Sequence, residues 1–193
     1  MAATKILVFG GSLRTGSLSA KLAALAAKEI ALLDADVTRI SLGDYPLPLY
    51  DGDLEAQKGV PENAIKLARL FAAQAGIFVA TPEYNHSLPP LLKNAIDWIS
   101  RIKPVAGIGY QGRVFGIGST SNGFIGGARA LLDLRKVLVT AAAAIVVPEQ
   151  VSISRAQDAF DESGNLKDAP PLATLKGVAT KLVGLAQRVN GTA

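Results

Sequence analysis

The chain has 193 residues, of which 49% are hydrophobic and 19% charged, and its formal net charge is +4. This balance predicts one folded domain over residues 1–193 and argues against intrinsic disorder. Cysteine is absent and histidine occurs once, which excludes disulfides, thiol catalysis and His-rich or Cys-based metal sites.

The expected location is the cytoplasm, with no membrane partner. No apolar run approaches the ~18 residues that span a bilayer, and the first predicted strand begins too early for a signal peptide to precede it. The positive charge is modest and Lys and Arg form no long cluster, so we expect no nucleic-acid partner. A mildly basic surface instead favours anionic small molecules.

Predicted strands and helices alternate along the chain. The strands are Thr4–Phe9, Asp36–Ser41, Gly76–Thr81, Arg113–Gly118 and Ala143–Val147. The helices are Leu18–Ala31, Pro61–Ala73, Leu88–Arg101, Gly126–Val139 and Leu172–Val189, with loops at Leu42–Val60 and 156–170. This alternation predicts an α/β fold with a doubly wound parallel sheet and helices on both faces.

In such a sheet, ligands bind outside the carboxyl ends of the strands, where the strand order reverses. For the flavodoxin-like order 2-1-3-4-5, that point lies between strands 1 and 3. We therefore expect the loops 10–17, 82–87 and 119–127, all rich in Gly, Pro, Ser and Asn, to converge in space.

The first loop, Gly10–Ser17, predicts an anion site because it joins a buried strand to a helix through small residues. The hydroxyls of Ser12, Thr15 and Ser17 and the guanidinium of Arg14 can complete a phosphate cage. A P-loop would need Lys at position 17 and the dinucleotide fingerprint is absent, so a monophosphate such as FMN fits better. The alternative is an ordinary turn capped by Ser17 or Ser19.

The second loop begins at Pro82, which ends the preceding strand. The backbone of residues 83–85 can offer hydrogen bonds to a flat heterocycle such as a flavin, whose pyrimidine side gains negative charge on reduction. The alternative is a Pro-initiated turn capped by Ser87. In the third loop, Ser119 could reach the ring or a substrate, but this segment alone favours a flexible connection.

Taken together, the motifs resemble the NADPH-dependent FMN reductase family of the flavodoxin-like superfamily, and within it the bacterial quinone and chromate reductases. The resemblance extends from Lys5 to about Val189. The matching segments are 11–17 (GSLRTGS), 81–87 (TPEYNHS), 92–98 (LKNAIDW), 126–129 (GGAR), Leu134-Arg135 and Val147–Glu149.

The resemblance implies one FMN-binding domain in which the flavin, and no protein side chain, carries the chemistry. NADPH or NADH would be the donor, and quinones, free flavin, azo compounds or chromate the acceptors. The implied FMN ligands are Ser12, Leu13, Arg14, Ser17 and Ser19 near the phosphate, and Pro82, Glu83, Tyr84, Asn85 and Ser119 near the isoalloxazine. The family often has Asn where this chain has Ser19.

The resemblance also implies a homodimer or homotetramer through the helix that contains Asn94, Asp97 and Trp98. Trp98 lies at the edge of the apolar stripe of this helix, so it would contact either a second subunit or the sheet of its own chain. We interpret His86, the one histidine, as a polar contact beside the flavin loop rather than as an acid or base.

Three other functions are open from sequence. A flavodoxin-type electron carrier would be more acidic than this chain. A non-catalytic flavodoxin-like module would not need the hydroxyl- and Arg-containing loop at 10–17. A nucleotide-binding regulator would need the missing P-loop Lys. No Gly-x-Ser-x-Gly motif suggests a hydrolase.

Overall fold

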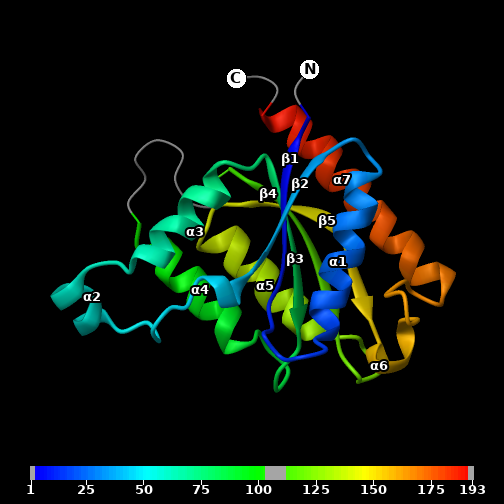
Figure 1. Ribbon diagram of the computed structural model, residues 1–193, viewed down its shortest axis with the longest axis horizontal. Coiled ribbons are helices and arrows are strands. Elements are labelled where there is room, and N and C mark those ends of the chain that lie inside the picture. Colours follow the sequence, from blue (N-terminus) through cyan, green and yellow to red (C-terminus); the bar gives the residue numbers. More distant parts are fainter. Residues whose placement is uncertain (1–2, 103–111, 191–193) are drawn as a thin grey trace.

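The computed structural model describes residues 3–102 and 112–190. Its centre is a sheet of parallel strands, drawn as arrows in Figure 1. Neighbouring strands pair in the order β2-β1-β3-β4-β5. The strands are β1 (Lys5–Gly10), β2 (Asp36–Ser41), β3 (Gly76–Pro82), β4 (Val114–Thr120) and β5 (Ile145–Ile153). The predicted flavodoxin-like order is therefore confirmed.

Helices cover both faces of this sheet. The helices α1 (Leu18–Ala31) and α7 (Ala169–Asn190) pack on one face, and α3 (Glu62–Ala72), α4 (Pro90–Ser100) and α5 (Ala128–Thr140) pack on the other. Successive side chains of a strand point to opposite faces. In β1, Ile6 and Val8 therefore belong to the core beneath α1 and α7, and Leu7 and Phe9 to the core beneath α3, α4 and α5. Among the described residues, none of the helices is both long and apolar enough to cross a bilayer.

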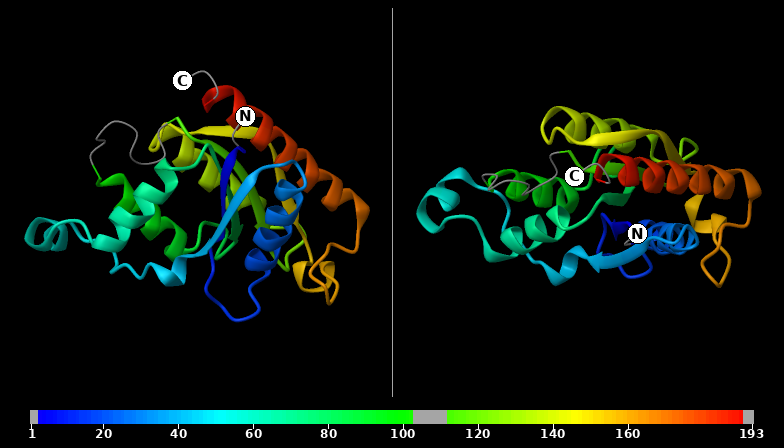
Figure 2. Two further views of the ribbon diagram at one scale, coloured as in Figure 1. Left: turned by 45° about the horizontal axis from the view of Figure 1, so that its top comes forward. Right: turned by 90° about the horizontal axis from the view of Figure 1, so that it is seen from above.

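The region Leu42–Val60, predicted as a loop, contains a 3-10 helix, η1 (Leu42–Asp44), and a short helix, α2 (Gly52–Lys58). The helix α2 buries none of its residues, so it has no apolar periodicity by which the sequence could reveal it. It is capped by Asp51, whose Oδ1 accepts hydrogen bonds from the amides of Asp53 (2.7 Å) and Leu54 (3.2 Å). Figures 1 and 2 show α2 projecting from the body of the molecule.

We call residues 45–58, which carry α2, the arm. The carbonyl oxygen of Pro48 accepts hydrogen bonds from Trp98 Nε1 (2.7 Å) and Asn94 Nδ2 (2.9 Å). The ring of Tyr50 meets that of Trp98 edge-on, with centroids 5.0 Å apart. Trp98 has no exposed surface. It is therefore a packing residue of its own chain, and the interpretation of Trp98 as a subunit contact is wrong.

A charged cluster holds the outer part of the arm to α4. Glu55 accepts hydrogen bonds from Tyr50 Oη (3.0 Å) and from Arg101 Nε (2.9 and 3.0 Å to its two oxygens). The hydrogen bond from Arg101 lowers the pKa of Glu55, and the hydrogen bond to Glu55 raises the pKa of Tyr50. The outer part of the arm is thus held by polar contacts, whereas Tyr45 and Leu47 at its start pack against the core beneath α3, α4 and α5.

The strand β5 continues past Val147, where the sequence predicts its end. Val146 pairs with Phe115 but Gln150 pairs with Ile117, so residues 147–149 form a bulge opposite Gly116. Pro148 lies in this bulge because it has no N–H to donate to a ladder. Pro148 therefore marks a bulge within the strand and not the end of the strand.

Most other boundaries differ from the prediction by one to three residues, and the differences at α5 and at residues 156–170 have structural causes or consequences. The helix α5 begins at Ala128, not at Gly126, because Gly126 and Gly127 have φ values of +62° and +85°, outside the right-handed helical region. The predicted polar loop 156–170 includes a short helix, α6 (Ala156–Ala159), and the start of α7.

Candidate active site

The three predicted loops converge at the carboxyl ends of β1, β3 and β4. The amide of Gly11 donates a hydrogen bond to the carbonyl of Ala80 (2.8 Å). Ser12 Oγ lies 3.3 Å from Tyr84 Oη, which joins the first loop to the second. The second loop reaches the third through Glu83, whose carboxylate accepts a hydrogen bond from the amide of Arg129 just beyond that loop (3.1 Å). The convergence predicted from topology is confirmed.

The end of the first loop is a helix start with buried hydroxyls. Ser17 caps α1, because its Oγ accepts a hydrogen bond from the amide of Ala20 (3.2 Å). Ser19 Oγ lies 3.0 Å from Ser17 Oγ, and both residues are buried. Gly16, with φ +70°, turns the chain into the helix. The alternative interpretation of a Ser17-capped turn is thus correct for this hydroxyl, and it does not exclude an anion site.

Several hydrogen-bond donors of the same loop have no acceptor among the described residues. Within the described part of the chain, no acceptor is found for the guanidinium of Arg14, which is exposed. The first turn of α1 contains no acidic side chain. In the described ranges of the chain, no acceptor is found for the backbone amides of Ser12, Leu13, Thr15, Gly16, Leu18 and Ser19. Clustered free amides at a helix N-terminus beside an Arg form an anion site, and a phosphate monoester such as that of FMN fits this donor set.

The second loop is a tight hairpin. Tyr84 and Ser87 exchange two backbone hydrogen bonds (3.1 and 3.0 Å), and the two residues between them, Asn85 and His86, have φ values of +48° and +66°. Positive φ at both central residues is typical of a type I′ turn. The amides of Asn85 and His86 make no hydrogen bond with the described residues. This hairpin therefore presents backbone donors, as a flavin-binding loop requires.

The side chain of Glu83 points toward α5. Its carboxylate is 8% exposed, and its Oε2 accepts hydrogen bonds from the amides of Arg129 (3.1 Å) and Ala130 (3.2 Å). We expected Glu83 to line a flavin ring. The structure leaves only its backbone for that purpose, since the carboxylate caps a helix.

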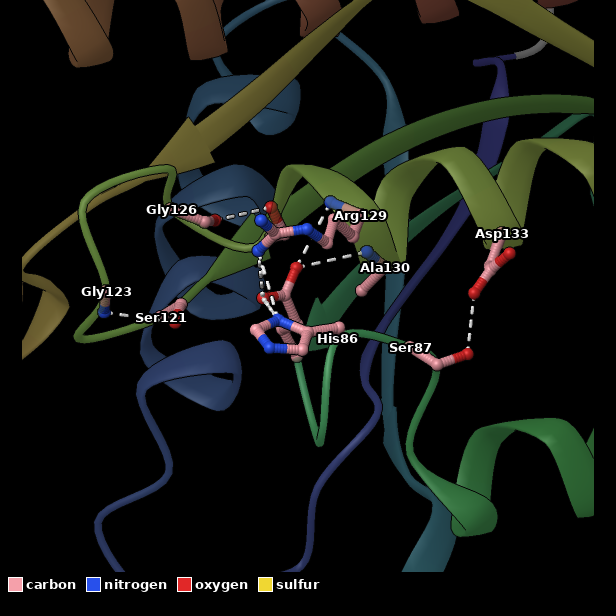
Figure 3. A network of polar contacts seen from close by, with 10 residues as sticks. His86, Ser87, Ser121, Gly123, Gly126, Arg129, Ala130 and Asp133 are labelled. Carbon is pink, nitrogen blue, oxygen red and sulfur yellow. Dashed lines mark hydrogen bonds and ion pairs between the residues drawn. The ribbon is translucent and has the colours of Figure 1, made fainter.

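His86 belongs to the same polar network, which Figure 3 shows with Arg129 and Ala130. Its Nδ1 lies 3.0 Å from Arg129 Nη1 and 3.6 Å from Glu83 Oε1. A guanidinium nitrogen can only donate, so Nδ1 accepts and the proton of the neutral ring is on Nε2. The imidazole is 73% exposed, in agreement with its interpretation as a polar contact.

Ser87 does not cap the helix that follows it, so this part of the turn interpretation is wrong. The N-cap of α4 is Pro89, which has no capping side chain. Ser87 Oγ instead donates a hydrogen bond of 2.6 Å to Asp133 Oδ2 on α5, as Figure 3 shows. This hydrogen bond, followed by the one from Lys136, lowers the pKa of Asp133.

The third loop is tied down rather than flexible. The amide of Ser121 donates a hydrogen bond to the carbonyl of Ile153, and the carbonyl of Ser121 accepts one from the amide of Ala156 (3.1 Å each). Ser119 is fully buried, and its Oγ donates to the carbonyl of Gly126 (2.7 Å). The hydroxyl that we expected near a ligand therefore shapes the loop from within.

Sequence reasoning missed two features of the site. Phe124, at the tip of the third loop, is 84% exposed, and exposure of an apolar side chain leaves no local sequence signal. The helix α5 has no capping side chain at its own N-cap, Gly127. The Gly pair before the helix was the available signal that another segment supplies the cap.

Comparison with known proteins shows the family of the chain. The family model described as NADPH-dependent FMN reductase matches residues 4–158. A quinone reductase of Escherichia coli is 35% identical over 190 residues, covering 96% of this chain and 97% of that protein. An NAD(P)H-dependent FMN reductase of Pseudomonas aeruginosa is 37% identical over 165 residues, covering 85% of each chain.

A solved structure is similar over nearly the same length. FerB of Paracoccus denitrificans, a flavoenzyme NAD(P)H:(acceptor) oxidoreductase, superposes with a TM-score of 0.74 at 28% identity, covering 96% of this chain and 98% of that chain. The expected FMN-dependent oxidoreductase is thereby confirmed at the level of the family. The family model and the curated relatives match most of the chain, and the sheet topology agrees with them. The chain therefore belongs to the NADPH-dependent FMN reductase family.

Proposed function

We propose that this protein is an FMN-dependent NAD(P)H:quinone oxidoreductase. The donor-rich loop between β1 and α1, with Arg14 exposed and without a partner in the described chain, is the observation that carries the proposal. Relatives named quinone reductase and NAD(P)H-dependent FMN reductase support it. FMN, when bound, supplies the two-electron chemistry between nicotinamide and acceptor.

The residues of the chain divide into two groups of ligands. The free amides of the first loop, Arg14 and the hydroxyls of Ser12, Ser17 and Ser19 would hold the phosphate. The hairpin would hold the pyrimidine side of the ring through the amides of Asn85 and His86, whose donors stabilise negative charge there. The side chains of Leu13, Pro82 and Tyr84 complete the proposed FMN ligands.

An aromatic acceptor suits the surface around the three loops. The loops themselves carry exposed apolar side chains: Leu13 (54% exposed), Tyr84 (44%), Ile125 (39%) and Phe124 (84%). Such side chains favour planar, apolar ligands through area burial and ring stacking. Quinones have these properties, and we extend the proposal to free flavin, azo compounds and chromate as further acceptors, with NADPH or NADH as donor.

We also propose a homodimer or homotetramer, with α4 and the arm at the subunit contact. On α4, Asn94 and Trp98 are engaged with the arm of their own chain, and Asp97 pairs with Lys93 (2.7 Å). The contact would therefore use the outer side of α4 and the arm, where Leu49 is 77% exposed. Sedimentation analysis tests this point, since a monomer at micromolar concentration contradicts it.

The first experiment is a visible absorption spectrum of the purified protein after addition of FMN and desalting, followed by anaerobic NADPH. Retained flavin bands that bleach with NADPH and return with a benzoquinone are the expected result. Retained bands that do not bleach indicate an electron carrier. Loss of all flavin on desalting would contradict the proposed function.

A further inference from the structure

Side-chain hydrogen bonds of Glu83, His86 and Ser87 join the segment 83–87 to the helix α5. The contacts of Glu83 and Ser87 carry an inference that rests on the proposed function. We propose that Glu83 and Ser87 are positioning residues, which dock the flavin-binding hairpin on α5. In this arrangement α5 is a rigid support, and the directions of the ring-side amides are set by a helix rather than by the loop itself.

The first junction is the carboxylate of Glu83 at the start of α5. The N-cap of this helix, Gly127, has φ +85° and offers no capping side chain. Glu83 Oε2 supplies the missing acceptor to two amides, those of Arg129 and Ala130. The side chain of Glu83 is 8% exposed and its carboxylate faces the positive end of a helix, so burial and charge both hold it in this position.

The second junction lies one helical turn further along α5. Ser87 Oγ donates its hydrogen bond of 2.6 Å to Asp133, and positions 129, 130 and 133 fall on neighbouring rows of one helix. The two ties thus flank Asn85 and His86, the residues whose amides are free and whose φ values are positive. A hairpin fixed at both ends holds its central amides in one direction.

Glycine at position 127 makes the first junction possible. A Cβ at this position would lie 3.0 Å from the side chain of Ser119 and 3.5 Å from Cβ of Glu83, and φ +85° disfavours any other residue. The third loop therefore ends at Gly127, beside the side chain of Glu83. Glu83 connects the second and third loops of the site through the helix that follows the third.

The test separates ring binding from phosphate binding. Flavin-free protein is titrated with FMN and with riboflavin, which has the same ring but no phosphate. We expect Glu83→Ala to weaken both ligands by the same factor, about tenfold, the effect of losing a helix cap. Glu83→Gln keeps an oxygen acceptor and should recover most of this loss. Arg14→Ala should weaken FMN alone.

A matched control is Asp51→Ala, which removes a carboxylate that caps α2 through two amides, far from the three loops in sequence. It should leave both affinities unchanged. In the flavin-free protein, hydrogen exchange at the amides of Arg129 and Ala130 should accelerate in Glu83→Ala and not in Asp51→Ala. This measurement tests the hydrogen bonds from these amides to Glu83 in the absence of flavin.

Three outcomes would overturn the inference: unchanged riboflavin affinity in Glu83→Ala, a loss confined to FMN, or an equal loss in Asp51→Ala. In each case the wild-type protein still binds FMN, and the proposed function stands. A wild-type protein that binds neither flavin would overturn the proposed function and this inference with it.

Discussion

Arg14 is the residue on which the phosphate site depends most directly. Replacing it with Ala should weaken FMN binding by about 1.5–3 kcal/mol, or roughly 10- to 150-fold, because a charge-assisted hydrogen bond is lost. Fluorescence titration of the flavin-free protein measures this change. Arg69→Ala, which removes an exposed Arg from α3, is the control and should have no effect. Unchanged FMN affinity in Arg14→Ala would place the phosphate elsewhere.

Asp133 should make the molecule sensitive to acid. Its pKa lies below the ordinary value of 3.8 because of the hydrogen bond from Ser87 and then that from Lys136. A lowered pKa in the folded state stabilises the protein above the unfolded pKa, and this contribution is lost as the pH falls through the folded pKa. Ser87→Ala should therefore raise the pKa of Asp133 and reduce stability near neutral pH more than in strong acid.

Carboxyl chemical shifts measured by NMR between about pH 2 and pH 6, a range that brackets the ordinary Asp pKa, follow this titration. Lys136→Ala, which removes the second partner of Asp133, should give a smaller shift in the same direction. An identical Asp133 titration curve in wild type and Ser87→Ala would contradict the assigned cause.

At this scale the sequence predicted which residues gather but not where their side chains point. Glu83 and Ser119 lie in the expected loops, yet the carboxylate of one caps α5 and the hydroxyl of the other supports Gly126. Both outcomes depend on partners 7 or about 46 residues away. No local pattern around either residue encodes such a partner, so only the folded chain reveals the direction.

At the scale of elements, a single substitution can remove one hydrogen bond between the arm and α4. Trp98→Phe keeps a ring in the core but removes the hydrogen bond from Nε1 to the carbonyl of Pro48. We expect a loss of about 1 kcal/mol in the free energy of unfolding. We also expect faster proteolysis within residues 45–58, because the arm has no core of its own.

Denaturant unfolding and limited proteolysis measure these two effects. Lys93→Ala, an exposed substitution on the same helix, is the control. Proteolysis of the arm at the wild-type rate in Trp98→Phe would show that Asn94 and the Tyr50 contacts suffice to hold it.

Elements that bury an apolar face were predictable, and those that do not were missed. The bounds of α1 and β2 agree with the sequence prediction, because burial against the sheet imposes periodicity on the chain. The helix α2 buries nothing and left no such signal. The bulge at residues 147–149 hid the second half of β5, since Pro148 resembles a strand end.

At the scale of the whole molecule, all three loops lie at one edge of the sheet, and this arrangement predicts how substrates alternate. If nicotinamide and acceptor use the same face of the flavin in turn, initial rates should follow ping-pong kinetics. Double-reciprocal plots should give parallel lines. At high concentration, NAD(P)H and the quinone should each inhibit competitively against the other, because both bind at the same face of the flavin. Intersecting lines without competition between NAD(P)H and quinone would exclude a shared site.

The topology explains why the place of the site could be predicted when its details could not. Parallel strands in the order 2-1-3-4-5 bring the ends of β1, β3 and β4 together whatever residues follow them. The shape of each loop then depends on a few contacts, such as those of Gly127 and Glu83, that the topology leaves open.

The arm offers a place where the chain can be rebuilt. The carbonyl oxygens of Pro46 and Pro48 accept hydrogen bonds from Asn63 and Trp98, and Glu55 of α2 pairs with Arg101. No residue of α2 belongs to either core. Because exposed segments with few contacts tolerate insertions, α2 should accept a grafted peptide or a small inserted domain without loss of the sheet. The three loops of the site lie outside residues 45–58, so a change in α2 would alter the segment proposed for the subunit contact and leave the sequence of the loops unchanged.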